Sequence, residues 1–469
     1  MVATTSSTIG YCEPPDASTL ELAQVARNDA GIIVIGAGPV GMRFTHDLLA
    51  RKPQLAVHLF GDEACKPYNR IQLSALLAGE INRDDIDLPL PALGNHPNFQ
   101  FTSSAIVEID RERKTVTDSS GTRFHYHKLV LATGAHAHIP NIPGIQRQGV
   151  FSFRSLKDTE SLYARILRSR HIVVVGGGLL GLEAAKGLLK FNTSVTVVQQ
   201  SSRLMNRQLD EQAAALLEAE VRALGIDVIT HSGVRSVEGF EHVTGVITRD
   251  GETIQCDTVL FCTGITPNLE LARKARIPVG TGILVNDQMR TSDPDIFAIG
   301  ECCEHLGVTY GLVNPGYEQA AVTAEIIANE PQENLPCYLG SMAISHLKVV
   351  GTSVCSLGEI SELPSRPFQK ELQYFDKPSG AYRKLVLLRG KIIGAVAIGN
   401  WPESRRVQEA YQNARKIRFW HLLRFYLTGT LWGKGSDDIG NWPSGTIICQ
   451  CNNISYGALS SALANNCST

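Results

Sequence analysis

The apolar residues of this chain fall into short unbroken runs that are separated by glycine-rich or polar turns. Ile32–Ile35 is one such run. Runs of this kind indicate strands buried on both faces of a parallel sheet, because a strand with one exposed face would alternate with polar residues. The same pattern predicts strands at Ala56–Phe60, Leu129–Gly134, His171–Val175, Ser194–Val198, Thr258–Gly264 and Asp295–Glu301.

Three glycines follow the first run at G-x-G-x-x-G spacing and precede a helix predicted at Met42–Leu49. Gly36 allows a tight turn, Gly38 lets backbone approach a pyrophosphate, and Gly41 lets the helix pack closely on the strand. The helix N-terminus offers unpaired N–H groups and a positive dipole end to phosphate. Strand, turn and helix together predict a dinucleotide-binding unit.

A second glycine fingerprint repeats the first. Gly176, Gly178 and Gly181 follow another apolar run, and Glu183–Leu189 continues as a helix. Each unit also contains a strand that ends in Thr-Gly. This duplication predicts an α/β fold with two doubly wound Rossmann-like dinucleotide-binding domains, the second inserted in the first, plus a small α+β C-terminal domain.

The pattern changes after about residue 335, where short strands alternate with turns. We expect strands at His346–Val354, Glu371–Phe375, Arg383–Leu388 and Lys391–Ile398, and helical character over Val407–Tyr426. The predicted organisation begins with a disordered extension at 1–30, a discontinuous first dinucleotide-binding domain at 31–150 and 275–335 and a second dinucleotide-binding domain at 151–274. A small α+β domain at 336–415, a helix and linker at 416–445 and a tail at 446–469 follow.

Composition narrows the class of protein. The chain has 469 residues, 43% of them hydrophobic, and a net charge of −2. This charge favours neither a nucleic acid nor a membrane as partner. The first thirty residues lack the basic and apolar regions of a signal peptide, and the 11 cysteines are an odd number spread through the chain. Both features predict a reducing, cytoplasmic setting.

Polar residues after two predicted strands suggest how each nucleotide ribose is held. Asp62 or Glu63 follows the second strand of the first unit, where an acid bonds ribose hydroxyls. In the second unit Gln199 stands where an NAD-preferring site usually has an acid. Gln199 can bond a ribose hydroxyl without repelling a 2′-phosphate, and Arg203 is near in sequence. We expect either NADH or NADPH as donor, with NADH favoured.

These motifs resemble the flavoproteins of the glutathione-reductase plan. They are most similar to the FAD/NAD(P)H-binding part of the assimilatory nitrite reductase large subunit and to electron-transfer subunits of assimilatory nitrate reductase. The resemblance rests on the stretches PYNRIQLSALLAGE, MNRQLDEQAAALL, IFAIGECCEHLGVTYGLVNPGYEQA and LKVVGTSV, and on LTGTLW followed by NWPSGTIICQC.

The resemblance implies that the first fingerprint binds FAD and the second NAD(P)H, that no acid or base side chain is certain to be catalytic, and that electrons pass to a nitrite- or nitrate-reducing acceptor. A homodimer is left open. The implied FAD residues are Gly36, Gly38, Pro39, Val40, Gly41, Asp62 or Glu63, Arg70, Ser74, Thr133, Gly134, Gly300 and Glu301. The implied NAD(P)H residues are Gly176, Gly178, Leu179, Leu180, Gly181, Glu183, Gln199 and Gly264.

The tail resembles the first half of a small 2Fe–2S domain. Cys449 and Cys451 are the candidate ligands, but such a cluster takes four cysteine ligands. Eighteen residues follow Cys451, and Cys467 among them is not at a usual ligand position. We therefore favour free thiols in this chain over a bound cluster.

Three other functions compete with this interpretation. The first is a ferredoxin or rubredoxin reductase. The second is a disulfide, CoA-disulfide or NADH oxidase-type flavoenzyme, which would use Cys65 beside the flavin loop. The third is a flavin-binding redox sensor without turnover. Cys65 lacks a cysteine partner at C-x-x-C or C-x-x-x-x-C spacing, which disfavours the second function.

Overall fold

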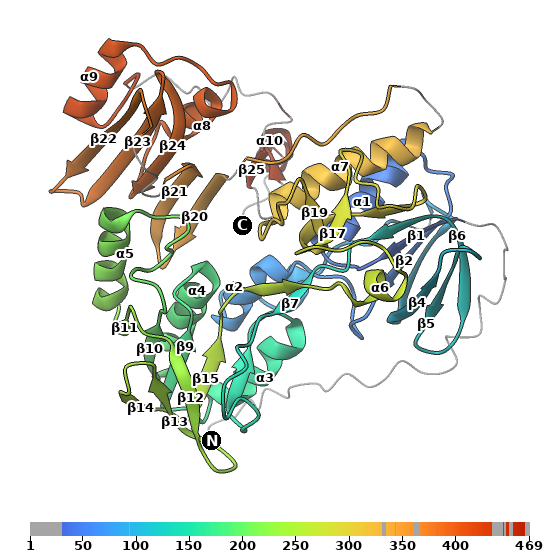
Figure 1. The fold of residues 1–469 in the computed structure, drawn as a ribbon, viewed down its shortest axis with the longest axis horizontal. Coiled ribbons are helices and arrows are strands. Elements are labelled where there is room, and N and C mark those ends of the chain that lie inside the picture. Colours follow the sequence, from blue (N-terminus) through green and yellow to red (C-terminus); the bar gives the residue numbers. More distant parts are fainter. Residues whose placement is uncertain are drawn as a thin grey trace, which may run out of the picture.

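The computed structural model describes residues 31–92, 94–330, 334–342, 344–360, 366–433, 444, 447–449 and 454–464 (Figure 1). The predicted N-terminal extension, residues 1–30, lies outside these residues, and so does most of the linker predicted at Gly433–Gly445. None of the helices within the described ranges is long and apolar enough to span a bilayer.

A sheet built on the apolar runs forms the first domain. Its parallel part has the order β3-β2-β1-β6-β18, and β5 and β4 continue antiparallel from β6. Helix α1 packs against α7, and both lie beside this sheet (Figure 1). The elements are β1 (Gly31–Ile35), α1 (Pro39–Arg51), β2 (Val57–Gly61), α2 (Leu73–Leu77), β3 (Phe99–Ser103), β4 (Ile106–Asp110), β5 (Thr115–Asp118), β6 (Arg123–Leu131), α6 (Glu270–Lys274), β17 (Ile283–Val285), β18 (Ile296–Ala298), β19 (Cys303–His305) and α7 (Val313–Asn329).

The second domain has a fully parallel sheet with the order β11-β10-β9-β15-β8. An antiparallel sheet, β12-β13-β14, shares a core with it through Val173, Val246 and Val259. The elements are β8 (Val150–Ser152), α3 (Leu156–Ile166), β9 (His171–Val175), α4 (Leu179–Leu188), β10 (Ser194–Val198), α5 (Glu211–Ala223), β11 (Ile226–Ile229), β12 (Val234–Gly239), β13 (Val243–Thr248), β14 (Thr253–Gln255) and β15 (Thr258–Phe261).

The chain crosses between the two domains twice, along an antiparallel pair made of β7 (Ala135–Ala137) and β16 (Ile265–Pro267). After the second crossing α6 packs against β4, and Ala272 belongs to the first core. The return to the first domain therefore occurs before residue 275, where the sequence pattern sets the boundary. The pairing of β18 with β6 closes the first sheet, which matches an inserted second domain.

The C-terminal domain is an antiparallel sheet with the order β20-β21-β24-β23-β22 and two helices. Two element predictions are wrong here. His346–Val354 is not one strand, because the chain turns at Val350, whose φ is +47°, and at Gly351. Val407–Tyr426 is two helices, because the chain between them runs back to the sheet and Ile417 N donates to Gly390 O. The elements are β20 (Ile344–Val349), β21 (Thr352–Gly358), β22 (Gln369–Asp376), β23 (Ala381–Leu388), β24 (Lys391–Ile398), α8 (Ser404–Gln412) and α9 (Phe419–Thr428).

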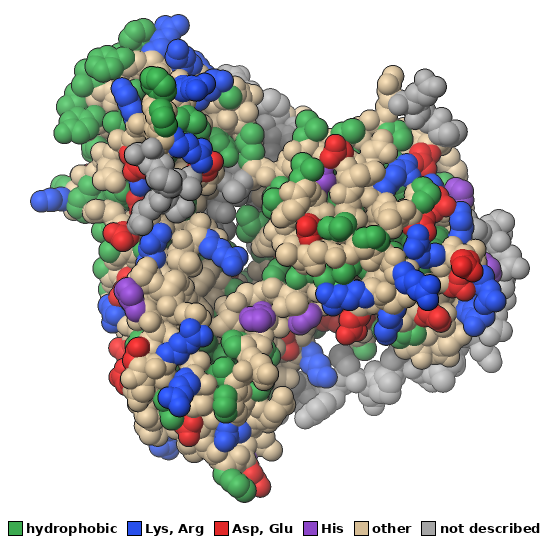
Figure 2. Space-filling model, in the orientation of Figure 1, with side chains coloured by type: hydrophobic (Ala, Val, Ile, Leu, Met, Phe, Trp, Pro, Cys, Tyr) green, Lys and Arg blue, Asp and Glu red, His purple; other side chains and the backbone are tan. Residues whose placement is uncertain are grey.

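The C-terminal domain rests on the second domain. Tyr382 Oη donates to Asp210 Oδ2 at 2.7 Å, and Lys384 Nζ lies 3.4 Å from the same oxygen. Figure 2 shows hydrophobic, Lys and Arg side chains gathered over the far end of this domain, around α9. The last described elements are β25 (Ile447–Cys449), β26 (Ile454–Ser455) and α10 (Tyr456–Ala464).

Candidate functional site

The first glycine turn has the close-packed geometry that its sequence predicts. Gly36 has φ +116°, and a Cβ there would lie 2.1 Å from Ala132 O. A Cβ on Gly41 would lie 1.9 Å from Gly36 O. Gly38 caps α1, with Pro39 as the first helical residue. Only glycine therefore fits at Gly36 and Gly41. The N-terminus of α1 is left open to an anion.

The second turn repeats this geometry. Gly176 has φ +118°, and a Cβ there would lie 2.3 Å from Cys262 O. A Cβ on Gly181 would lie 2.0 Å from Gly176 O, and Gly178 caps α4. An added Cβ would meet nothing within 4 Å at Gly178 and only the Arg70 side chain, at 3.8 Å, at Gly38, so each turn is a cradle whose open side a side chain at these positions would enter. The residues of both turns are therefore able to hold the pyrophosphate groups of two dinucleotides.

One cleft of about 2210 Å³ joins the two cradles. Pockets for a drug-sized ligand are roughly 300–1,000 Å³, so this cleft has room for two dinucleotides. Figure 2 shows the surface hollowed between the lobes that hold them. The predicted residues that line it are Gly36, Gly38, Pro39, Val40, Gly41, Asp62, Arg70, Thr133, Gly134, Gly176, Gly178, Leu179, Leu180, Glu183, Gln199, Gly264, Gly300 and Glu301.

Three predicted residues do not line the cleft. Gly181 lies beneath the second turn, where it lets α4 approach Gly176. Glu63 accepts hydrogen bonds from Tyr68 Oη at 2.8 Å and from Arg70 Nη2 at 3.0 Å. Ser74 contacts the cleft indirectly, through Glu183. Of the two acids after β2, Asp62 is thus the one that faces the cleft beside the first glycine turn.

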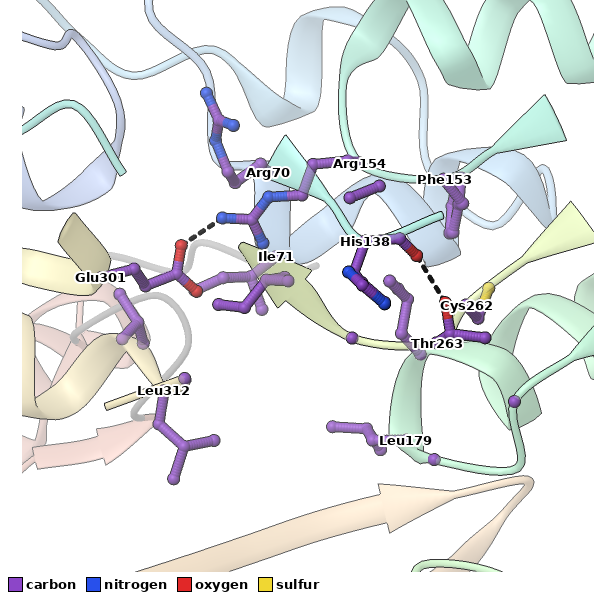
Figure 3. A pocket seen from close by; sticks show the side chains of 18 of the residues that line it. Arg70, Ile71, His138, Phe153, Arg154, Leu179, Cys262, Thr263, Glu301 and Leu312 are labelled. Carbon is purple, nitrogen blue, oxygen red and sulfur yellow. Dashed lines mark hydrogen bonds and ion pairs between the residues drawn. The ribbon is translucent and has the colours of Figure 1, made fainter. Parts of the chain in front are cut away.

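An ion pair lies in the middle of the cleft. Arg154 Nη2 binds Glu301 Oε2, and Arg154 Nε donates to Ala135 O at 3.2 Å (Figure 3). Glu301 comes from the first domain, after β18, whereas Arg154 comes from the second domain, between β8 and α3. Sequence reasoning missed Arg154, because no local motif marks it and only the fold brings the two together.

Glu183 is a partly buried carboxyl on α4 that lines the same cleft. Ser74 Oγ, on α2, donates to Glu183 Oε2 at 2.8 Å. Burial raises the pKa of Glu183 above its ordinary value, and the Ser74 hydrogen bond opposes this rise. A carboxyl in this state is easier to protonate than an exposed one.

The far end of the cleft differs from the sequence expectation. Gln199 Oε1 accepts from Gly177 N at 2.7 Å, and its Nε2 donates to Ser201 Oγ. Arg203 Nε donates to Leu209 O at 3.0 Å and does not line the cleft. Two arginines that the sequence did not single out, Arg207 and Arg249, line it instead.

The cysteines offer no reactive pair within the described residues. Cys302 and Cys303 are fully buried, and burial raises the pKa of both thiols. Cys262 lines the cleft, and burial raises its pKa to about 12. Cys65 is outside the cleft, and burial followed by the charge of Glu63 raises its pKa.

A metal centre is likewise absent from the part of the chain that the structure describes, where no three His, Cys, Asp or Glu side chains gather. Cys451 lies outside that part. Cys449 ends β25, but its side chain is not described. The predicted cluster ligands therefore stay a prediction.

Relatives with known names match most of this chain. It is 36% identical over 440 residues to the NAD(P)H nitrite reductase of Bacillus subtilis (strain 168), covering 92% of this chain and 53% of that protein. It is 33% identical over 439 residues to the assimilatory nitrate reductase electron transfer subunit of the same organism, covering 93% and 55%. The chain thus spans about half the length of these relatives. A rubredoxin-NAD(+) reductase of Ectopseudomonas oleovorans is 33% identical over 340 residues, covering 71% of this chain and 82% of that protein.

Solved structures give the same architecture. An NADH:rubredoxin oxidoreductase from Clostridium acetobutylicum has a TM-score of 0.69 at 26% identity, covering 85% of this chain and 99% of that chain. A ferredoxin reductase from Rhodopseudomonas palustris has a TM-score of 0.71 at 27% identity, covering 78% and 90%.

Two family models account for the domains. Residues 344–415 match the rubredoxin NAD+ reductase C-terminal domain. Residues 30–325 match the pyridine nucleotide-disulphide oxidoreductase family, which implies an enzyme that binds FAD and NAD(P)H. The two glycine cradles on one cleft are what such an enzyme needs, and this chain belongs to the pyridine nucleotide-disulphide oxidoreductase family.

Proposed function

We propose that this chain takes a hydride from NAD(P)H through FAD and passes the electrons to a nitrite- or nitrate-reducing acceptor. The single observation that carries the first half is the pair of glycine cradles that open on one cleft. The second half rests on the names of the relatives that match nearly the whole chain. FAD accepts two electrons as hydride and can release them singly, which couples NAD(P)H to one-electron acceptors.

The protein's part in this reaction is to bind, orient and exclude water. The first cradle and the N-terminus of α1 hold the FAD pyrophosphate, with Asp62 toward its ribose and Arg70, Thr133, Gly134 and Glu301 along the rest of the molecule. The second cradle and α4 hold the NAD(P)H pyrophosphate, with Glu183 toward the nicotinamide and Gly264 at the border of its ring. The roles are those that the resemblance implies, and they are supported by the position of these residues in the lining of the cleft.

Apolar side chains in the lining of the cleft would help to exclude water from the reacting region once both nucleotides are bound. Four of them are labelled in Figure 3: Ile71 and Leu312 lie on the side of Glu301, and Phe153 and Leu179 lie on the side of Cys262 and Thr263. A dry site strengthens the interactions of the charged groups within it and prevents loss of hydride to water.

A stopped-flow experiment tests the proposal. The FAD-loaded protein is mixed anaerobically with NADH or NADPH, and flavin absorbance is followed near 450 nm. Bleaching with at least one nucleotide is expected, and bleaching with neither would overturn the proposal. The redox-sensor alternative predicts the second outcome.

A ferredoxin or rubredoxin reductase is the second candidate. It is favoured by the C-terminal domain match at residues 344–415 and by the rubredoxin reductase relative of which 82% is covered. The two candidates differ in the acceptor. The reduced protein is offered either rubredoxin or the catalytic component of a nitrite or nitrate reductase, and NAD(P)H oxidation is compared at equal acceptor concentration. Faster oxidation with rubredoxin would favour the second candidate.

A further inference from the structure

The far end of the cleft, beyond the second glycine turn, has no carboxylate among the described residues. The acids that line the cleft are Asp62, Glu183 and Glu301. Asp62 follows β2 in the first domain, Glu301 pairs with Arg154, and Glu183 bonds Ser74. None of the three follows β10, where an acid would bond both hydroxyls of the nicotinamide nucleotide's adenosine ribose.

Gln199 does not replace that acid. Its carboxamide oxygen accepts from Gly177 N and its amide nitrogen donates to Ser201 Oγ, so both ends are committed inside the protein. The loop after β10 folds back over the glycine turn, because Met205 N donates to Gly177 O at 2.9 Å. This fold places the next part of the loop, including Arg207, at the cleft.

A second arginine reaches the cleft from a different part of the sequence. Arg249 follows β13, and its N–H donates to Gly233 O at 2.8 Å. Its side chain lies over Gly233, where an added Cβ would be 3.3 Å from Arg249 Nε. The loop before Gly233 is tied to the Arg207 loop, since His231 N donates to Ser201 O at 3.0 Å. Ser201, Arg207, Gly233 and Arg249 all line the cleft.

Neither guanidinium has a carboxylate partner within the ranges that the structure describes. Arg207 and Arg249 are both exposed, and both line the cleft. A planar guanidinium binds phosphate with two parallel hydrogen bonds, and two of them match the charge of a phosphate monoester.

We propose that Arg207 and Arg249 form a subsite for the 2′-phosphate of NADPH, with the Ser201 hydroxyl beside them, so that this chain prefers NADPH to NADH. The proposal rests on the proposed function, because it concerns the donor nucleotide of the same cleft. It departs from the expectation from the sequence, which leaves both donors open and favours NADH. It also replaces Arg203, which binds Leu209 O, as the arginine of interest.

Binding of nucleotide fragments tests the subsite without any flavin chemistry. Calorimetry on the FAD-loaded protein at low salt compares 2′,5′-ADP with 5′-ADP, which lacks the 2′-phosphate. We expect 2′,5′-ADP to bind at least ten-fold more tightly. In Arg207→Gln and in Arg249→Gln this difference falls about ten-fold, the order expected for one charge-assisted pair. Arg168→Gln is the matched control, since Arg168 is exposed on the same domain and does not line the cleft.

Equal affinity of the wild-type protein for the two fragments would overturn the proposal. So would variants that stay folded, retain FAD and keep the full preference for 2′,5′-ADP. In stopped flow, the expected result is faster flavin bleaching by NADPH than by NADH at limiting nucleotide. If 2′,5′-ADP is preferred but neither nucleotide bleaches the flavin, the subsite stands and the proposed oxidoreductase function fails.

Discussion

Ser74 and Glu183 join the two nucleotide-binding domains by one hydrogen bond of 2.8 Å between Ser74 Oγ and Glu183 Oε2. Ser74 lies on α2 of the first domain and Glu183 on α4 of the second, 109 positions later. The pair lies where the two domains meet, and Ser74 is the hydrogen-bond partner that the structure gives this partly buried carboxyl. Loss of this hydrogen bond should therefore lower the rate of hydride transfer and leave the affinity for FAD unchanged.

Removing the Ser74 hydroxyl should slow hydride transfer. We expect Ser74→Ala to bleach the flavin about ten-fold more slowly, because a buried carboxyl that loses its hydrogen bond is both mispositioned and costly to ionise. Ser74→Thr, which keeps a hydroxyl, should recover most of the rate. Stopped-flow absorbance measures both variants. Equal rates for Ser74→Ala and the wild type would contradict a role for the pair.

Glu183 should give stability a distinct pH dependence. Its pKa is raised in the folded protein, chiefly by burial, so the folded state holds the proton at pH values where the unfolded chain has lost it. Stability from this group is present below the unfolded pKa of about 4.3 and is lost as pH rises through the raised folded pKa. Glu183→Gln should lack this loss. Urea unfolding from about pH 4 to pH 8 compares the two, and superimposable profiles would contradict the assignment.

The two glycine cradles should be separable by mutation. Gly36→Ala puts a Cβ 2.1 Å from Ala132 O and should abolish FAD binding. Gly176→Ala puts a Cβ 2.3 Å from Cys262 O and should leave FAD bound but remove nucleotide-dependent bleaching. Flavin absorbance and nucleotide titration measure the two losses. Gly94→Ala is the control, because an added Cβ there has no neighbour within 4 Å and should change neither.

Arg154 should hold Glu301 in place for the flavin. Arg154→Gln leaves a partly buried carboxylate without its ion partner, so we expect FAD to bind ten-fold or more weakly. Arg154→Lys keeps the charge but loses the contact of Nε with Ala135 O, and should have an intermediate effect. Recovery of free-flavin fluorescence on dilution gives the affinity. An unchanged affinity in Arg154→Gln would show that the pair is not needed at this site.

Cys65 should be dispensable. It lies outside the cleft, and its raised pKa keeps the thiol protonated, which is the opposite of a redox-active cysteine. Cys65→Ser should therefore reduce one-electron acceptors at the wild-type rate. A disulfide- or CoA-disulfide-type enzyme would lose its activity. NAD(P)H-driven reduction of ferricyanide and of CoA disulfide in parallel distinguishes the two cases.

The apolar runs and the glycine turns could be predicted from the sequence, because residues close together in the chain determine both. A continuous run such as His171–Val175 can only be buried on both faces, and it is β9 without a change of bounds. The backbone at Gly36 and Gly176 needs φ near +117°, which only glycine adopts easily, so the spacing of glycines reports the turn directly. The pattern fails at Val350, because this β-branched residue takes a positive φ of +47° and a two-residue turn there divides the predicted strand into a hairpin.

The sequence by itself therefore determined two nucleotide cradles, their order along the chain and the glycines that form them. The tertiary structure alone decided which polar groups meet in the cleft. Arg154 meets Glu301 across 147 positions, and Arg249 reaches the cleft from a hairpin with no motif of its own. The physical reason is the separation along the chain of the residues that interact. Turns and strands follow from neighbours in the chain, whereas ion pairs and subsites follow from which faces two separately folded sheets turn toward each other.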